Sequence, residues 1–239
     1  MPAIMDSRHL YNERTSEINL YFEFLFDVLD RRPKLKFSDE EKGFDRDLIH
    51  ILKANAYLVV YNLIESTVCN AIEDIHTTLK AETELCADKL NIELAKRAFK
   101  KVNEQTISQA NLTDTSVGTF IVKDWLNEHD KVINSNKNPL FSGNVDARKI
   151  REVADLYGFS HQTDQDITRN GRSLASIKST RNNLAHGTDS FKDRGQQTSV
   201  DELRTMKDEV IAYLDQMLSN IEAYLNTQSY FREEFRAGA

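Results

Sequence analysis

One uninterrupted helical pattern constrains the fold more than any other feature, and it runs from about Phe44 to at least Leu79. Its middle part, AYLVVYNLIESTVCNAI, is apolar on nearly every face, and the polar exceptions in the stretch are Asn55, Asn62 and Glu65. A helix that is apolar all round is buried on every side, in the core of a domain or of a dimer. We therefore expect a helical bundle built around this segment.

The rest of the chain also favours helices over strands. Only 8 glycines and 3 prolines occur, too few for the many turns of a β-sandwich or a β-barrel. We predict an all-α fold, a single helical domain over residues 1–239, with a less regular insert at about 108–144 in which the state of TFIVKDWL stays open. Further helices are expected at about His9–Leu29, at about Cys86–Ile107, within NVDARKIREVADLYGF and GRSLASIKSTRNNLAHG, and at Val200–Tyr230.

Inward faces and helix ends follow from the same spacing. Ser7 is the expected cap of the first helix, and Gly158 and Gly187 are the expected stops of two later ones. The predicted inward residues are Leu20, Phe24 and Val28 in the first helix; Val145, Ile150, Val153, Ala154 and Tyr157 before Gly158; and Leu203, Met206, Val210, Tyr213, Leu214, Met217, Ile221 and Tyr224 in the last helix.

Nothing in the sequence indicates a cofactor, a metal site or a membrane segment. There is no Walker loop or GxGxxG, no signal-peptide pattern, and no apolar stretch near the ~20 residues that span a bilayer. Cys69 and Cys86 lack zinc spacing and are expected to be buried free thiols, which is typical of a cytoplasmic protein. Five histidines without a second ligand at fixed spacing are interpreted as ordinary surface or core residues: His9, His50, His76, His129 and His161.

The run RNNLAHG near the end of a predicted helix holds the candidate reactive groups. At 100° per residue, Leu174, Ile177, Leu184 and Ala185 form one arc that should face the core, and Arg181 lies in the middle of it. An arginine is essentially always charged, so burial requires a partner. The expected partner is Glu65, with Asn62 beside it, and loss of such a buried pair by Glu65→Ala should cost ~3–5 kcal/mol.

These residue types suit cleavage of a phosphodiester without a metal. His186 can carry the proton of a ribose 2′-OH or of the leaving 5′-oxygen, Arg181 can neutralise the phosphoryl oxygens, and Asn182 can orient either group. One such pair is sparse, so two copies facing each other in a homodimer are expected. The alternative is purely structural, because Arg and His near a helix C-terminus also stabilise its dipole.

Any grip on RNA must come from a local basic patch, because the formal net charge is -7. The alternative to an RNA groove is an ordinary solvated face. The candidate RNA-binding residues are Arg148, Lys149, Arg151 and Lys178, with Arg169 and Arg172 as further members.

RNNLAHG resembles the signature of the HEPN superfamily, an arginine, a polar residue, a short spacer and a histidine late in a helix. Two further blocks, LKANAYLVVYNLIESTVCNAIEDIH and GNVDARKIREVADLYGF, are similar in order and type to the prokaryotic HEPN-like nucleases of toxin–antitoxin and defence systems. The resemblance spans about Leu48 to Tyr224.

The resemblance implies a dimerising helical bundle with metal-independent ribonuclease activity, no cofactor, and an antitoxin or defence protein as a possible partner. It makes Arg181, Asn182 and His186 active-site residues, with Glu65 as a supporting acid. Some toxins of the family carry a modifiable tyrosine two residues after the histidine, where this chain has Thr188. Other members have lost catalysis and only bind RNA or protein.

Overall fold

The computed structural model describes residues 5–100, 102, 116–134, 141 and 143–236. Its contacts divide the chain into two compact units. We call Arg8–Thr67 with Thr163–Asp215 the motif unit, since it contains RNNLAHG, and Met1–Ser7, Val68–Gln162 and Gln216–Ala239 the stacked-histidine unit. The prediction of one domain over 1–239 stays a prediction.

The described residues are overwhelmingly helical, which confirms the all-α class. The elements are α1 (Asp6–Arg31), β1 (Lys34–Lys36), β2 (Glu41–Gly43), α2 (Arg46–Ala81), α3 (Ile92–Phe99), α5 (Val117–Asn134), α6 (Ala147–Tyr157), α7 (Gln165–Thr168), η1 (Arg169–Gly171), α8 (Arg172–Ala185), α9 (Phe191–Gln197), α10 (Val200–Asn226) and η2 (Glu233–Phe235). Among these helices, none is long and apolar enough to cross a membrane.

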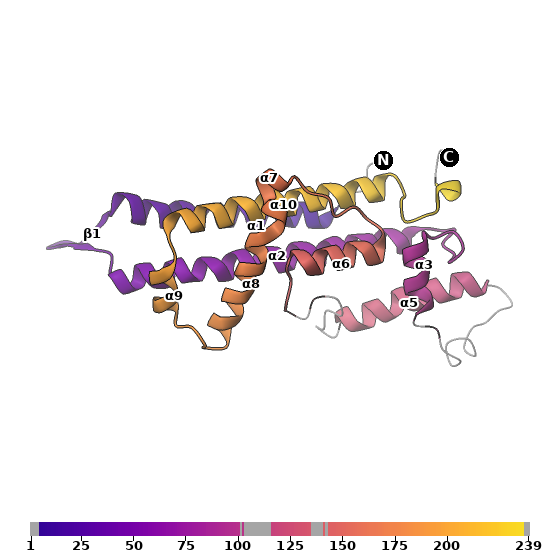
Figure 1. Ribbon diagram of the computed structural model, residues 1–239, viewed down its shortest axis with the longest axis horizontal. Helices are drawn as coiled ribbons and strands as arrows, with labels where there is room; N and C mark the ends of the chain where they lie inside the picture. Colours follow the sequence, from indigo (N-terminus) through magenta and orange to yellow (C-terminus); the bar gives the residue numbers. More distant parts are fainter. Residues whose placement is uncertain (1–4, 101, 103–115, 135–140, 142, 237–239) are drawn as a thin grey trace. The chain divides into compact units, whose positions relative to one another are not determined.

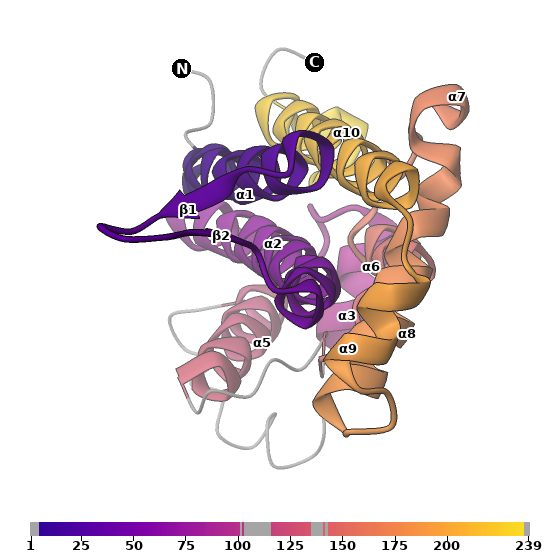
Figure 2. The ribbon, with the colours of Figure 1, turned by 90° about the vertical axis from the view of Figure 1, so that its left-hand side faces the viewer.

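In the motif unit, α1 and the parts of α2 and α10 that belong to it lie side by side, and α8 crosses α2 and α10 on the side away from α1 (Figures 1 and 2). The Tyr11 hydroxyl donates to the Ile211 carbonyl at 2.9 Å, and Arg204 pairs with Asp30 at 2.6 Å near the other end of α1. These contacts make α1 and α10 antiparallel neighbours. The strands β1 and β2, which the sequence did not predict, form a two-stranded antiparallel hairpin that joins α1 to α2.

A close approach of α9 to α2 fixes the chain that follows the motif. A Cβ at Gly195 would lie 1.8 Å from the His50 carbonyl oxygen, so only glycine fits there. Beside it, the Lys192 Nζ lies 2.7 Å from Asp47 Oδ2. The turn after RNNLAHG is therefore anchored at the start of α2.

In the stacked-histidine unit, one end of α6 is fixed by a buried polar network. The side chains of Asn91 and Tyr224 both donate to the Tyr157 carbonyl, at 3.2 and 2.7 Å. Gly158 then ends α6 in the left-handed conformation with φ +81°, as the sequence predicts. All five predicted inward residues of this block and all eight of α10 are buried, which confirms both faces.

Several boundary and burial predictions are wrong. The helix expected at Cys86–Ile107 is only Ile92–Phe99, because Asn91 caps it with a side-chain bond to the Leu94 amide; residues 101 and 103–107 lie outside the described residues. TFIVKDWL, left open, lies in α5. Ser7 is the second residue of α1 rather than its cap.

The buried face of α1 also differs from the prediction. Val28 is buried, but Leu20 and Phe24 are 68% and 49% exposed. The packing face is set instead by Tyr11, Ile18, Phe22 and Leu25, which lie toward the neighbouring helices at helical spacing. Cys69 and Cys86 are free thiols, as expected, but they are half-buried rather than buried.

Candidate functional site

The side chain of Arg181 lies against α2, at the partly buried face of α8. It is half-buried, and its guanidinium carbon lies 4.7 Å from the centre of the Tyr61 ring. A cation over an aromatic face is stabilised by the negative charge density of that face. Tyr61 itself is buried. Sequence reasoning missed this residue, although it stands one helical turn before Glu65 on the same face of α2.

Glu65 is close enough to Arg181 for their charges to interact, but the two form no tight pair. Burial raises the pKa of the Glu65 carboxyl, and the nearby Arg181 charge only partly opposes that rise. Glu65 is half-buried, and for this pair the structure describes no hydrogen bond or ion pair. Asn62, expected beside Glu65, is exposed. The predicted cluster is thus an open arginine–tyrosine–glutamate arrangement rather than a buried ion pair.

Asn182 and His186 complete the motif at the C-terminal end of α8. The Arg181 Nη1 donates to the Asn182 Oδ1 at 3.0 Å, so Asn182 orients the guanidinium. His186 is the C-cap residue of α8; its amide donates to the Asn182 carbonyl at 2.9 Å, and its side chain is exposed. Five residues at 100° each place Arg181 and His186 about 140° apart around the helix. Ala185, predicted to face the core, is also exposed.

The turn after His186 is held by a small polar network. The Asp189 carboxylate accepts from Asn183 Nδ2 at 3.4 Å and pairs with the Arg194 guanidinium at 2.5 Å. The Arg194 and Asn183 bonds hold the pKa of the Asp189 carboxyl below its usual value. This network keeps the exposed His186 on an ordered turn. In the sequence, this network is marked only by an acid before the start of α9, Asp189, and an arginine within it, Arg194.

The predicted RNA-binding residues are divided between the two units. Arg148, Lys149 and Arg151 lie on α6 in the stacked-histidine unit, where the Arg148 and Lys149 side chains contact Glu152 at 2.5 and 3.4 Å. Lys178 lies on α8 in the motif unit, four residues before Asn182 and half-buried. Over the described part of the chain, no group of three His, Cys, Asp or Glu side chains is arranged to hold a metal ion.

A comparison with models of known protein families shows which family the chain belongs to. The family model HEPN_MAE_28990-like HEPN matches residues 10–230, which include α2, α8 and α10. The chain belongs to this HEPN family. Searches among curated proteins and among solved structures gave no significant match.

Membership of the HEPN family indicates a nuclease, an RNA-related protein or a nucleotide-binding module. The matched range includes RNNLAHG, and the match confirms the membership of the HEPN superfamily that this run predicts.

Proposed function

We propose that this HEPN chain is a metal-independent endoribonuclease. The observation that supports the proposal most directly is the placement of Arg181, which is half-buried over Tyr61 and near Glu65 rather than extended into solvent. Its guanidinium donates one described bond, to Asn182, and a guanidinium has five N–H donors. The remaining donors suit the non-bridging oxygens of a phosphate, which arginine binds in bidentate fashion.

In the proposed reaction, side chains carry the protons. A histidine at position 186 removes the proton of the ribose 2′-OH, whose oxygen attacks the adjacent phosphorus. Arg181 neutralises the charge that develops on the phosphoryl oxygens. The bond from phosphorus to the 5′-oxygen breaks, and that oxygen takes up a proton. The products are a 2′,3′-cyclic phosphate and a 5′-hydroxyl, and DNA, which lacks the 2′-OH, is left intact.

The geometry of α8 favours a homodimer for this chemistry. On an ideal helical wheel Arg181 and His186 are about 140° apart, and Arg181 is half-buried whereas His186 is exposed, so we infer that a second chain completes the site. In the proposed dimer, an arginine of each chain lies near a histidine of the other across a twofold axis, and the two histidines supply both an acid and a base. We further propose a cytoplasmic toxin or defence effector, with an antitoxin or another system protein as its restraint.

The different burial of Arg181 and His186 also favours a second candidate, a non-catalytic module that binds RNA or a protein partner. An exposed histidine and a half-buried arginine suffice for binding without any proton transfer. Only activity distinguishes this candidate from the first.

The deciding experiment incubates the purified protein with mixed RNA in excess EDTA and identifies the new ends. We expect cyclic-phosphate ends, and a loss of about 10²–10⁴-fold in rate in Arg181→Ala and in His186→Ala. Matched controls are Arg204→Ala and His9→Ala, which remove an exposed arginine and an exposed histidine elsewhere in the motif unit. Intact RNA under every condition, with binding retained, would establish the non-catalytic module instead.

Mixing the two inactive variants tests the shared site. If arginine and histidine come from different chains, heterodimers of Arg181→Ala and His186→Ala contain one intact pair, and part of the activity returns. No recovery in a verified heterodimer contradicts the shared site while leaving the ribonuclease itself intact.

A further inference from the structure

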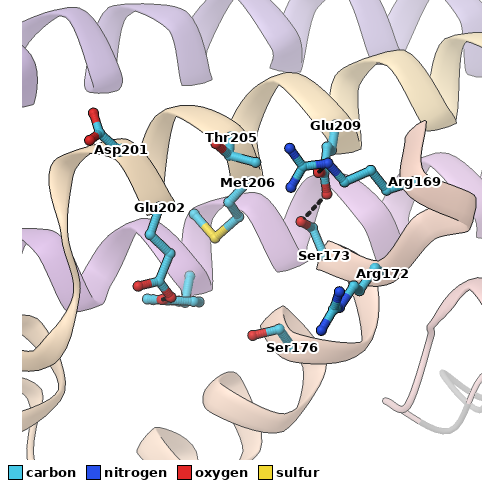
Figure 3. Close-up of a pocket in the computed structure, with 10 residues that line it drawn as sticks. Arg169, Arg172, Ser173, Ser176, Asp201, Glu202, Thr205, Met206 and Glu209 are labelled. Carbon is cyan, nitrogen blue, oxygen red and sulfur yellow. Dashed lines mark hydrogen bonds and ion pairs between the residues drawn. The ribbon is translucent and has the colours of Figure 1, made fainter. Parts of the chain in front are cut away.

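A second site lies in the motif unit, on the side of α8 that faces α10. It is a cavity of 340 Å³ between η1, the first turns of α8, and α10, with Tyr57 of α2 as part of its lining. Figure 3 shows the two ends of this cavity: Asp201 and Glu202 at one end, Arg172 at the other, and Met206 between them. Its lining residues are Tyr57, Arg169, Arg172, Ser173, Ser176, Asp201, Glu202, Thr205, Met206 and Glu209.

Most charges in the cavity are fixed by partners within the protein. Glu209 is 5% exposed; it accepts from the Ser173 hydroxyl and lies 3.0 Å from the Arg169 Nε. Glu202 accepts from the Tyr57 hydroxyl at 2.6 Å, and burial together with this bond raises the pKa of Tyr57 to about 12, so the phenol remains a donor. Lys53, buried on α2, adds a positive charge near Glu202.

Two charged side chains of the cavity lining, Arg172 and Asp201, differ from the others in their contacts. For Arg172 and Asp201, the structure describes no hydrogen bond or ion pair with any residue that it covers, and the two are not bonded to each other although they line one cavity. Each lies at a helix N-terminus, Arg172 as the first residue of α8 and Asp201 as the second of α10. The Arg172 amide already donates to the Arg169 carbonyl, so the group that this end of the cavity offers to an anion is the Arg172 guanidinium.

The chain bends sharply to place this basic end. Arg169, Asn170 and Gly171 all have positive φ, at 45°, 56° and 73°. Left-handed residues other than glycine are uncommon, and such strain persists where the surroundings hold it and concentrates at functional sites. Here the pair of Arg169 with Glu209 holds the turn, and Arg172 follows it in the lining of the cavity.

We propose that this cavity binds a small zwitterion of the basic amino-acid class, with its carboxylate at Arg172 and its side-chain cation at Asp201 and Glu202. The separation of the two ends of the cavity selects this class. Arg172 precedes Ser173, which bonds to Glu209 on α10. Glu209 is eight residues, about 12 Å along that helix, from Asp201 at the other end. A carboxylate and a cation joined by an apolar chain, as in arginine, reach across Met206, whereas glycine is too short.

The test is calorimetric titration of the full-length protein with L-arginine at constant ionic strength. Agmatine, which lacks the carboxylate, citrulline, which lacks the cation, and glycine are the comparison ligands. We expect saturable binding of arginine, weaker binding of agmatine and citrulline, and no binding of glycine. Each lost charge-assisted contact should weaken arginine binding about tenfold or more.

Two variants assign the ends of the ligand. Asp201→Asn should weaken arginine and agmatine equally, whereas Arg172→Ala should weaken arginine and leave agmatine unchanged. Asp208→Asn and Arg31→Ala remove exposed charges outside the cavity and should change neither, and a thermal melt shows that each variant is folded.

Several results would overturn the proposal: no saturable binding of arginine, or binding that both cavity variants leave unchanged. Nucleoside monophosphates that bind in place of arginine, with the same sensitivity to Arg172→Ala, would assign the cavity to a different class of ligand. None of these results depends on cleavage of RNA, so the ribonuclease proposal is tested separately.

Discussion

His76 and His129 in the stacked-histidine unit and His186 in the motif unit differ in how far they are exposed to solvent. In the stacked-histidine unit, His76 and His129 lie ring on ring with centroids 3.6 Å apart, and both are buried. In the motif unit, His186 stands exposed at the end of a helix. A histidine enclosed by aromatic rings contributes packing, whereas an exposed one can exchange protons with a substrate.

The described contacts of His76 and His129 fit a structural role. His76 Nε2 lies 2.7 Å from the Tyr157 hydroxyl, and His129 Nε2 lies 2.7 Å from the Glu73 carboxylate. The Arg97 guanidinium lies 4.9 Å from the centre of the Tyr157 ring. Burial lowers the pKa of His76 well below its usual value, and the charges of His129, Lys80 and Arg97 lower it further. His76 is therefore held neutral.

The largest expected effect is that of His76→Ala on stability. Removing a ring packed between His129, Trp125 and Tyr157 leaves a cavity, and such large-to-small changes cost about 3–5 kcal/mol. His186→Ala, at an exposed position, should stay within about 0.5 kcal/mol. Urea denaturation of both variants measures the difference. Equal, small losses would mean that the stacked pair contributes no more to stability than the exposed histidine.

The next effect is a dependence of stability on pH that originates at His76. Its pKa is lowered in the folded state, so below about 6.5 the unfolded chain binds a proton that the folded chain does not. The unfolding free energy should therefore fall as pH drops from 6.5 to 5.5, by up to ~1.4 kcal/mol per pH unit. Denaturation at several pH values measures the slope, and His76→Phe, which retains a ring, should reduce it. An unchanged slope in that variant assigns the dependence to other groups.

Both regions also show which features a sequence reveals. The long apolar run of α2, the inward face of α10 and the stop at Gly158 follow from short-range spacing, and all are confirmed. His76 and His129 are core residues, which agrees with the prediction of ordinary surface or core histidines. Their stacking joins residues 53 positions apart on α2 and α5, so spacing gives no sign of it. Tyr61 beneath Arg181 was missed for a similar reason, because the crossing angle of α8 over α2 decides which aromatic the guanidinium meets.

The smallest expected effect, at Glu65, decides how far the motif unit differs from the buried cluster. A fully buried ion pair would lose ~3–5 kcal/mol on removal of the acid. Glu65 is half-buried, and burial raises the pKa of its carboxyl more than Arg181 lowers it, so the cost of desolvation exceeds the attraction. Glu65→Gln removes both, and we expect a change within about 1 kcal/mol at pH 7, in the direction of greater stability.

The pH dependence of the unfolding free energy of Glu65→Gln shows whether Glu65 stabilises or destabilises the folded protein. Because the pKa of Glu65 is raised on folding, protonation at lower pH relieves the penalty in the wild type, and the advantage of Glu65→Gln should shrink as pH falls toward 4.5. Glu23→Gln, at an exposed position of α1, is the matched control and should show no such trend. A loss of several kcal/mol in Glu65→Gln would mean that Arg181 depends on a tight ion pair, and the motif unit would then resemble the buried cluster instead of contrasting with it.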